Sequence, residues 1–179
     1  MRLDRPIATS RLTLQVLDEA AATGPYLAWM QDPDVLRFLE ARHGKHDTQS
    51  LAVFIRSANN SADSLLLGIF ERPTIRHIGN IKLGPIDHPN RRGEIGIMIG
   101  ERACWGRGYA REAIQALTDY AFDVLHLHKL TAGYLAPNAA SGRAFEAVGF
   151  ITEARYAQHF LLDDTWVDSV RIARFAPAR

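Results

Sequence analysis

The alternation of apolar and polar residues changes character along the chain. Residues 11–16 alternate as a half-buried strand does, and residues 48–58 place their apolar side chains on one face of a helix. Short apolar runs bounded by turn residues then predict consecutive strands up to about residue 99. The clearest helix follows at residues 108–124, because apolar residues recur at helical spacing over its whole length.

In chain order, these patterns predict strands and helices that alternate around one central sheet. The predicted elements are a strand at 11–16, a helix at 18–30, a loop at 36–47, a helix at 48–58, strands at 64–71, 77–83 and 94–99, a helix at 108–124, a strand at 129–135, a helix at 139–148, and a closing hairpin of strands 150–160 and 166–175. This order is typical of a mixed α/β fold, and we expect a single domain over residues 1–179.

Glycine interrupts two of these elements. The pair Gly24-Pro25 lies inside the predicted helix 18–30 and is able to split it. Gly96 lies inside the predicted strand 94–99, where a glycine often marks a bulge or a close backbone approach.

Composition and charge give no sign of a nucleic-acid-binding, secreted or membrane-spanning protein. The formal net charge of the 179 residues is only +1, so nothing demands nucleic acid or an anionic membrane as a partner. A single cysteine, Cys104, cannot form an internal disulfide, which favours a reducing compartment. The first residues contain no apolar targeting segment, and the most apolar run, 65–70, is too short to span a bilayer. We therefore expect a cytoplasmic protein.

The stretch WGRGYAREA, residues 105–113, places two glycines directly ahead of the predicted helix 108–124. Glycines let a backbone curl around an anion, and a helix N-terminus offers unpaired N–H groups to it. The alternative is a plain tight turn. No P-loop string occurs in the chain, and the dinucleotide fingerprint fails because residue 111 is Arg rather than Gly.

The stretch 105–110 resembles the coenzyme A loop of the GNAT superfamily of N-acetyltransferases, in the form found in its RimJ/RimL-type branch. The family loop reads Gln/Arg-x-x-Gly-x-Gly/Ala, and Trp105 departs from its first position. A second block, NAASGRAFEAVGF at 138–150, resembles the family's Asn-x-x-Ser block ending in Gly-Phe. The ends TSRLTL and WVDSV also resemble this branch, so the resemblance covers nearly the whole chain.

This resemblance implies a mostly antiparallel sheet flanked by helices, with two central parallel strands, 94–99 and 129–135, that splay apart. Acetyl-CoA enters the gap, with its pantetheine arm along the first strand and its pyrophosphate on the loop amides. The residues implied in coenzyme binding are Ile97, Met98, Ile99, Trp105, Gly106, Arg107, Gly108, Tyr109, Ala110, Asn138, Ser141 and Arg143. Asn138 also fits an ordinary helix N-cap, and Arg107 and Arg143 either reach phosphate or are simply solvated.

Acetyl transfer to an amine requires a base for the amine proton, and Glu94 at the start of its strand is the candidate. The alternatives are a solvated strand-end charge at Glu94, with Glu101 or water as the base. By resemblance, the oxyanion donor is a backbone N–H near Ile97 or Met98.

The acid that protonates the leaving thiolate is less defined. Many family members place a tyrosine where this chain has Phe145, so Ser141 is the substitute candidate. Ser141 otherwise caps its helix, and water then supplies the proton. Cys104 lies beside the phosphate loop, away from the expected thioester, and the histidines show no metal-ligand spacing, so we expect no metal.

The acceptor amine is open on sequence grounds: a protein N-terminus, an amino sugar, a polyamine or another small amine all fit the resemblance. We expect its pocket in region 31–47 and at the turn of the closing hairpin, with Arg42, His43 and Asp47 as candidate lining residues. A non-catalytic acyl-CoA-binding module is the alternative function, which Phe145 permits. Both a monomer and a homodimer are compatible with the sequence.

Overall fold

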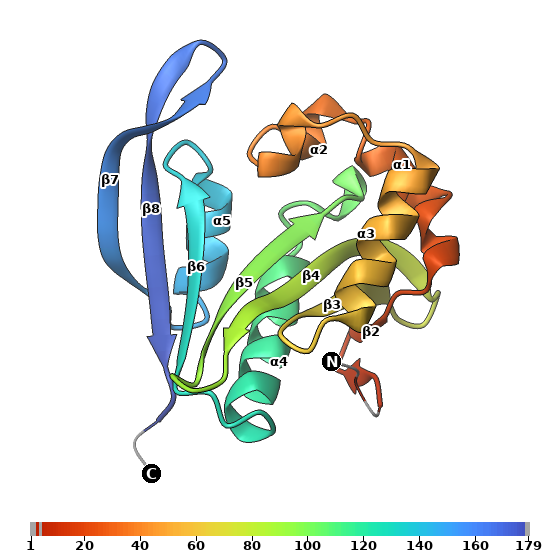
Figure 1. The fold of residues 1–179 in the computed structure, drawn as a ribbon, viewed down its shortest axis with the longest axis horizontal. Coiled ribbons are helices and arrows are strands. Elements are labelled where there is room, and N and C mark those ends of the chain that lie inside the picture. The colour runs from red at the N-terminus through yellow and green to blue at the C-terminus, as the bar shows by residue number, and fades with distance from the viewer. Residues whose placement is uncertain (1–2, 4, 178–179) are drawn as a thin grey trace.

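The computed structural model describes residue 3 and residues 5–177. Within them, eight strands form one sheet in the order β1-β2-β3-β4-β5-β6-β8-β7 (Figure 1). The strands are β1 (Ile7–Ala8), β2 (Leu12–Val16), β3 (Leu65–Glu71), β4 (Arg76–Asp87), β5 (Arg92–Ile99), β6 (Lys129–Leu135), β7 (Ile151–Leu162) and β8 (Thr165–Phe175). Every neighbouring pair is antiparallel except β5 and β6, which confirms the predicted mixed sheet.

Helices cover both faces of this sheet. Their bounds are α1 (Pro25–Trp29), α2 (Pro33–Leu36), α3 (Thr48–Asn60), α4 (Tyr109–Asp123) and α5 (Ala139–Glu146), with short 3-10 turns at Glu19–Ala22, Glu40–His43 and Arg102–Cys104. The first three helices lie on one face, and α4 and α5 lie on the other (Figure 1). None of the helices in the described part of the chain has the length and apolar character needed to cross a membrane.

The core divides into two clusters, one on each face of the sheet. Ile114 and Leu117 of α4 are fully buried against Ile81 of β4, as the helical spacing predicted. On the opposite face, Ile55 of α3 packs in a second cluster with Leu66 of β3. Burying an aliphatic side chain of this size is worth roughly 1.5–3 kcal/mol. Both faces of the central strands are therefore covered, which fixes their register.

The predicted helix over residues 18–30 is wrong as one continuous helix, and the split considered at Gly24-Pro25 is confirmed. Glu19–Ala22 forms a 3-10 turn and α1 begins only at Pro25, because Gly24 adopts a left-handed φ of +71° between them. The region 36–47 also contains the 3-10 turn Glu40–His43 rather than loop alone.

The bulge considered at Gly96 is also wrong. Gly96 pairs regularly with Lys82, and the register shifts instead between Leu83 and Ile86 of β4. Gly84 lies in this irregular stretch of β4 and has a φ of +144°. A Cβ atom there would lie 2.8 Å from the Asp63 carbonyl oxygen. The shift thus occurs opposite Glu94.

Strands β5 and β6 pair over three residues and then separate. The parallel register joins Arg92 to Lys129, Gly93 to Leu130 and Glu94 to Thr131, and no later pair follows among the described residues. Beyond Glu94, β5 stays paired with β4 on its other side, while β6 stays paired with β8 (Figure 1). The splayed central strands expected from the sequence are therefore confirmed.

Candidate active site

The separation leaves one edge of β5 facing the gap. The Gly100 amide donates to the Ile78 carbonyl of β4 at 2.9 Å. Because backbone groups alternate sides along a strand, those of Met98 also point to β4, whereas those of Ile97 and Ile99 point into the gap. Of the three residues expected beside the pantetheine arm, Ile97 presents its N–H and carbonyl to the gap and Ile99 presents its N–H, because the Ile99 carbonyl accepts from the Trp105 indole. Met98 presents its side chain to the opposite face.

Trp105 attaches the loop 105–110 to the end of this edge. Its indole Nε1 donates to the Ile99 carbonyl at 2.7 Å, and the Arg102 guanidinium lies 5.7 Å from the centre of its ring. Arg102 in turn pairs with Asp34 at 2.7 Å. Trp105, which departs from the family pattern, therefore positions the loop against the end of β5. The sequence alone did not indicate this contact.

The glycines of the loop adopt the left-handed conformation. Gly106 has φ +73° and Gly108, the N-cap of α4, has φ +78°. Within the described chain, the amides of Gly106, Arg107 and Gly108 donate to no acceptor. A Cβ atom at Gly106 would meet nothing within 4 Å, so the space over these amides is open. Unpaired N–H groups at a helix N-terminus form a ready site for an anion such as pyrophosphate.

Tyr109 supports the loop from behind. Its side chain is buried, its hydroxyl bonds the Glu71 carboxylate, and the Arg11 guanidinium lies 4.6 Å from the ring centre. The hydrogen bond to Glu71 raises the pKa of the tyrosine hydroxyl, with burial acting in the same direction. Arg11 also donates to the Arg107 carbonyl at 3.0 Å. Because its side chain is occupied in this way, Tyr109 has only its backbone amide left to contact a ligand at the open side of the loop.

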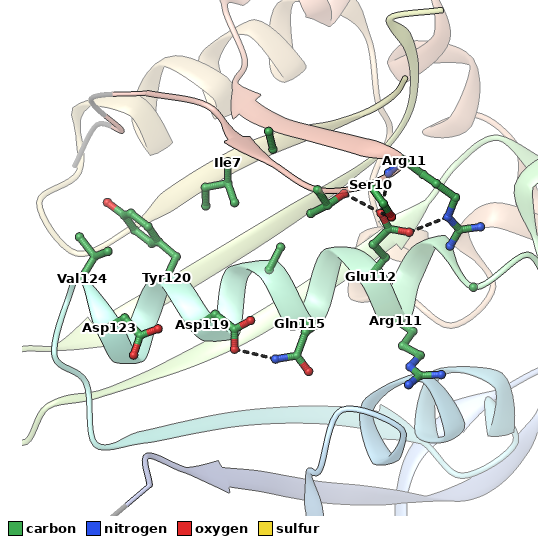
Figure 2. A pocket seen from close by; sticks show the side chains of 14 residues that line it. Ile7, Ser10, Arg11, Arg111, Glu112, Gln115, Asp119, Tyr120, Asp123 and Val124 are labelled. Carbon is green, nitrogen blue, oxygen red and sulfur yellow. Dashed lines mark hydrogen bonds and ion pairs between the residues drawn. The ribbon is translucent and has the colours of Figure 1, made fainter. Parts of the chain in front are cut away.

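Glu112 joins the first turn of α4 to the β1–β2 turn (Figure 2). Its carboxylate accepts from Thr9 Oγ1 at 2.6 Å, Ser10 Oγ at 3.0 Å, and from the Arg11 amide and Nε at 2.9 and 2.7 Å. Burial raises the pKa of Glu112, but these hydrogen bonds prevail and lower it. The groove of about 700 Å³ drawn in Figure 2 is lined by these residues and by none of the catalytic candidates.

The second sequence block begins α5 beside the gap. Asn138 is the N-cap, and its Oδ1 accepts from the Ser141 amide at 3.2 Å. Phe145 is buried, with its ring centre 5.0 Å from that of Phe150, so its position contributes no proton. Arg143 and Arg107 are both exposed.

A cleft of about 260 Å³ brings the catalytic candidates together. Glu94 and Ile97 of β5 line it together with Asn138 and Ser141 from the start of α5, although the two elements are separated by more than 30 residues of the chain. The Glu94 carboxylate accepts two hydrogen bonds from Arg171 of β8, at 3.0 and 2.9 Å. This bond to Glu94 raises the pKa of Arg171, although burial opposes it.

Sequence reasoning missed Arg171. It follows the stretch WVDSV directly, but no local pattern marked it as a partner of Glu94. The pair forms because β8 lies next to β6 in the sheet, a neighbour relation that chain order does not reveal.

The other candidate groups lie away from this cleft. The Glu101 carboxylate accepts from the Ala103 amide at 3.3 Å and caps the turn at Arg102–Cys104. The Cys104 thiol is buried, and this burial raises its pKa. Across residues 3 and 5–177, no group of three or more His, Cys, Asp or Glu side chains is placed to hold a metal ion.

Two further cavities are lined by residues of region 31–47, where the sequence led us to expect the acceptor pocket. One of about 690 Å³ separates the turn Glu40–His43 from the β7–β8 turn and is lined by Arg42 and His43, as expected. Asp47 does not line it; its carboxylate accepts from the Ser50 amide at 2.7 Å and caps α3. The second cavity, of about 480 Å³, lies under α3 and shares lining residues with the Glu94 cleft.

Comparison with known proteins identifies the family of the chain. A model of the acetyltransferase (GNAT) domain matches residues 11–151, and the chain belongs to this family. An uncharacterized N-acetyltransferase, p20 of Bacillus licheniformis, is 29% identical over 147 residues, which cover 81% of this chain and 82% of the relative. The protein is thus an acetyl-CoA-dependent N-acetyltransferase of the RimJ/RimL-like type.

Relatives with named acceptors match shorter stretches. The spermidine N(1)-acetyltransferase of Vibrio cholerae is 30% identical over 95 residues, about half of each chain (53% and 54%). The Escherichia coli enzyme named for the alanine of ribosomal protein uS5 is 32% identical over 84 residues, 46% of this chain and 42% of the relative. In structure, the Vibrio cholerae spermidine N-acetyltransferase with CoA and spermine has a TM-score of 0.84, at 21% identity over 93% of this chain and 96% of that one.

Proposed function

We propose that the protein transfers the acetyl group of acetyl-CoA directly to a primary amine, in a ternary complex formed at the cleft between β5 and β6. The observation that carries this proposal is the continuity of the site. The open amides at Gly106 and Gly108 lead to the free edge of β5 at Ile97 and Ile99, and this edge leads to Glu94.

The donor is held mainly by backbone groups. The amides of the loop 105–110 bind the pyrophosphate, and the edge at Ile97 and Ile99 pairs with the pantetheine amides. Asn138 keeps its amide nitrogen for pantetheine, because Oδ1 is the atom that caps α5. Arg107 and Arg143 are exposed and long enough to approach the phosphate groups.

Glu94 removes the amine proton, directly or through water. A carboxylate has about four lone-pair sites, so the two bonds from Arg171 leave room for a proton. The neutral amine attacks the thioester carbonyl carbon, and the oxyanion that forms accepts from the Ile97 N–H. The C–S bond then breaks, and the thiolate takes a proton from the Ser141 hydroxyl or from water. The nitrogen, positively charged after the attack, loses its second proton to that same group, which leaves a neutral amide and a neutral thiol.

Two measurements test this proposal together. A ligand present at about a hundredfold over its Kd adds roughly 2.7 kcal/mol to the stability of a protein, so acetyl-CoA is expected to raise Tm. A panel of primary amines, assayed by release of the CoA thiol, then reports transfer. Binding without thiol release would instead identify a non-catalytic acyl-CoA-binding module, and no thermal response to millimolar acetyl-CoA would contradict the proposed site.

A further inference from the structure

The cavity under α3 has an apolar wall. It has a volume of about 480 Å³, within the range of pockets that bind small molecules. Side chains from several elements form this wall, chiefly Tyr26, Met30, Leu51, Phe54, Leu66 and Met98. Such a wall stabilises a ligand by removing apolar surface from water rather than by forming ion pairs.

Gly96 connects this cavity to the catalytic cleft. Both spaces are lined by Gly96 and Ile97, and Glu94 and Met98 flank Gly96 on the same face of β5. A Cβ atom at Gly96 would meet nothing within 4 Å. Of the thirteen glycines, all of them described by the structure, only Gly96 combines this open space with a backbone outside the left-handed region. Neither backbone conformation nor packing requires glycine here, so the missing side chain leaves an opening.

The charges around the opening do not favour a ligand with several cations. Lys82 lies directly across from Gly96 in the β4–β5 register and lines the cavity. Glu40 lines both spaces, and its carboxylate lies 3.9 Å from Arg42. The Glu94 carboxylate is paired with Arg171. One ammonium can lie beside Glu40 and Glu94, but a second one inside the cavity would meet Lys82 and an apolar wall.

We infer that the acceptor is a primary amine carried on a single apolar body, which fills the cavity under α3 while the nitrogen passes over Gly96 to Glu94. This inference rests on the proposed acetyl transfer and names its substrate class. Di- and polyamines are excluded from this class because their second ammonium would lie beside Lys82 in an apolar cavity, where the one lining carboxylate, Glu40, is already shared with Arg42 and the first ammonium.

A matched set of amines tests the substrate class. Butylamine and 1,4-diaminobutane have the same carbon chain and differ in one ammonium; 2-phenylethylamine and spermidine extend the comparison. For the wild-type protein, kcat/KM is expected to be at least about tenfold higher for each monoamine, a discrimination typical of apolar pockets. Lys82→Glu should reduce this ratio, whereas Arg5→Glu, the same charge change at an exposed position that lines none of these cavities, should leave it unchanged.

Gly96→Val tests the opening itself. The side chain should lower kcat/KM for 2-phenylethylamine at least about tenfold, as misplacement near the reacting groups does. The thermal response to acetyl-CoA should not change, and Tm should stay the same or rise, because glycine weakens a strand interior. Gly96→Ala is expected to give a smaller loss in the same direction.

The outcomes separate this inference from the acetyl transfer on which it rests. Preferred turnover of 1,4-diaminobutane or spermidine would overturn the inference and leave the transfer reaction intact. Wild-type turnover by Gly96→Val would overturn the role of the opening. If acetyl-CoA binds but no amine of the set causes thiol release, the proposed function fails, and the inference fails with it.

Discussion

The side of β5 on which we propose that the donor binds presents backbone groups, whereas the side proposed for the acceptor presents side chains. On the donor side, the open groups are the amides of Gly106 and Gly108, the backbone edge at Ile97 and the N–H of Ile99. On the acceptor side, a side-chain wall under α3 meets the Glu94–Arg171 pair. Binding of the donor therefore depends on where the backbone is left exposed. Binding of the acceptor depends instead on the side chains that surround the cavity.

This difference explains why the first of these sites can be predicted from the sequence and the second cannot. A backbone site for a phosphate needs glycines at fixed spacing next to a helix, and this leaves a local motif. A side-chain cavity needs only suitable volume and polarity, which residues from distant segments supply. Changes on the donor side should consequently alter coenzyme binding, and changes on the acceptor side should alter turnover.

The largest expected effect is that of Glu94→Gln. Glutamine keeps the shape and one acceptor for Arg171 but cannot take a proton, so kcat should fall by roughly 10²–10⁴. Affinity for acetyl-CoA should be nearly unchanged. Raising the pH should restore part of the rate, and earlier for an α-amine with a pKa of about 8 than for a lysine-type amine with a pKa of about 10.4.

Glu101→Gln is the matched control, because this carboxylate caps the turn at Arg102–Cys104 outside the cleft. Its kcat should stay near that of the wild type. If instead Glu94→Gln turns over normally from mildly acidic to mildly basic pH, Glu94 is a strand-end charge and the proton goes to Glu101 or water.

A smaller effect is expected on the donor side from Gly106→Val. The side chain would project into the open space over the loop amides, so acetyl-CoA affinity should fall at least about tenfold, by isothermal titration. Gly24→Val is the control, because Gly24 has a similar φ of +71° and equally open space at its Cβ position. Both variants should lose comparable stability from backbone strain, but only Gly106→Val should lose coenzyme affinity; an equal loss in both would remove the loop from the site.

The smallest effect is expected from Glu112→Gln, which weakens the support behind the loop. Hydrogen bonds to a charged carboxylate are worth about 1.5–3 kcal/mol, and a loss up to this range in the free energy of unfolding is expected near pH 7. The pKa of Glu112 is lowered from 4.5 in the folded protein, because the bonds from Thr9 and Arg11 outweigh burial. Its contribution is therefore complete above about pH 4.5 and is lost as the pH falls through the folded pKa.

Urea unfolding of both proteins between pH 3 and pH 7 measures this difference. It should be largest at neutral pH and should shrink in acid, while Glu146→Gln, an exposed change on α5, should show little difference at any pH. If the difference in the free energy of unfolding between wild type and Glu112→Gln is the same at pH 3 as at pH 7, the charge of Glu112 does not strengthen its hydrogen bonds.

Local patterns predicted most of the elements that surround the proposed donor site. The buried stripe of Ile114 and Leu117 marked α4, and the two loop glycines marked its start. These features were readable because helix periodicity and left-handed turns depend on residues close together in the chain. The single-domain organisation over residues 1–179 stays a prediction.

The sequence by itself thus determined the strands, the main helices and the glycine loop ahead of α4, because each depends on neighbours within about one turn or one strand. Only the tertiary structure decided that Arg171 pairs with Glu94 and that Gly96 opens between two cavities. It also placed the register shift at Gly84 rather than Gly96. These features depend on which distant strands lie side by side, and β8 reaches Glu94 only because it packs between β6 and β7.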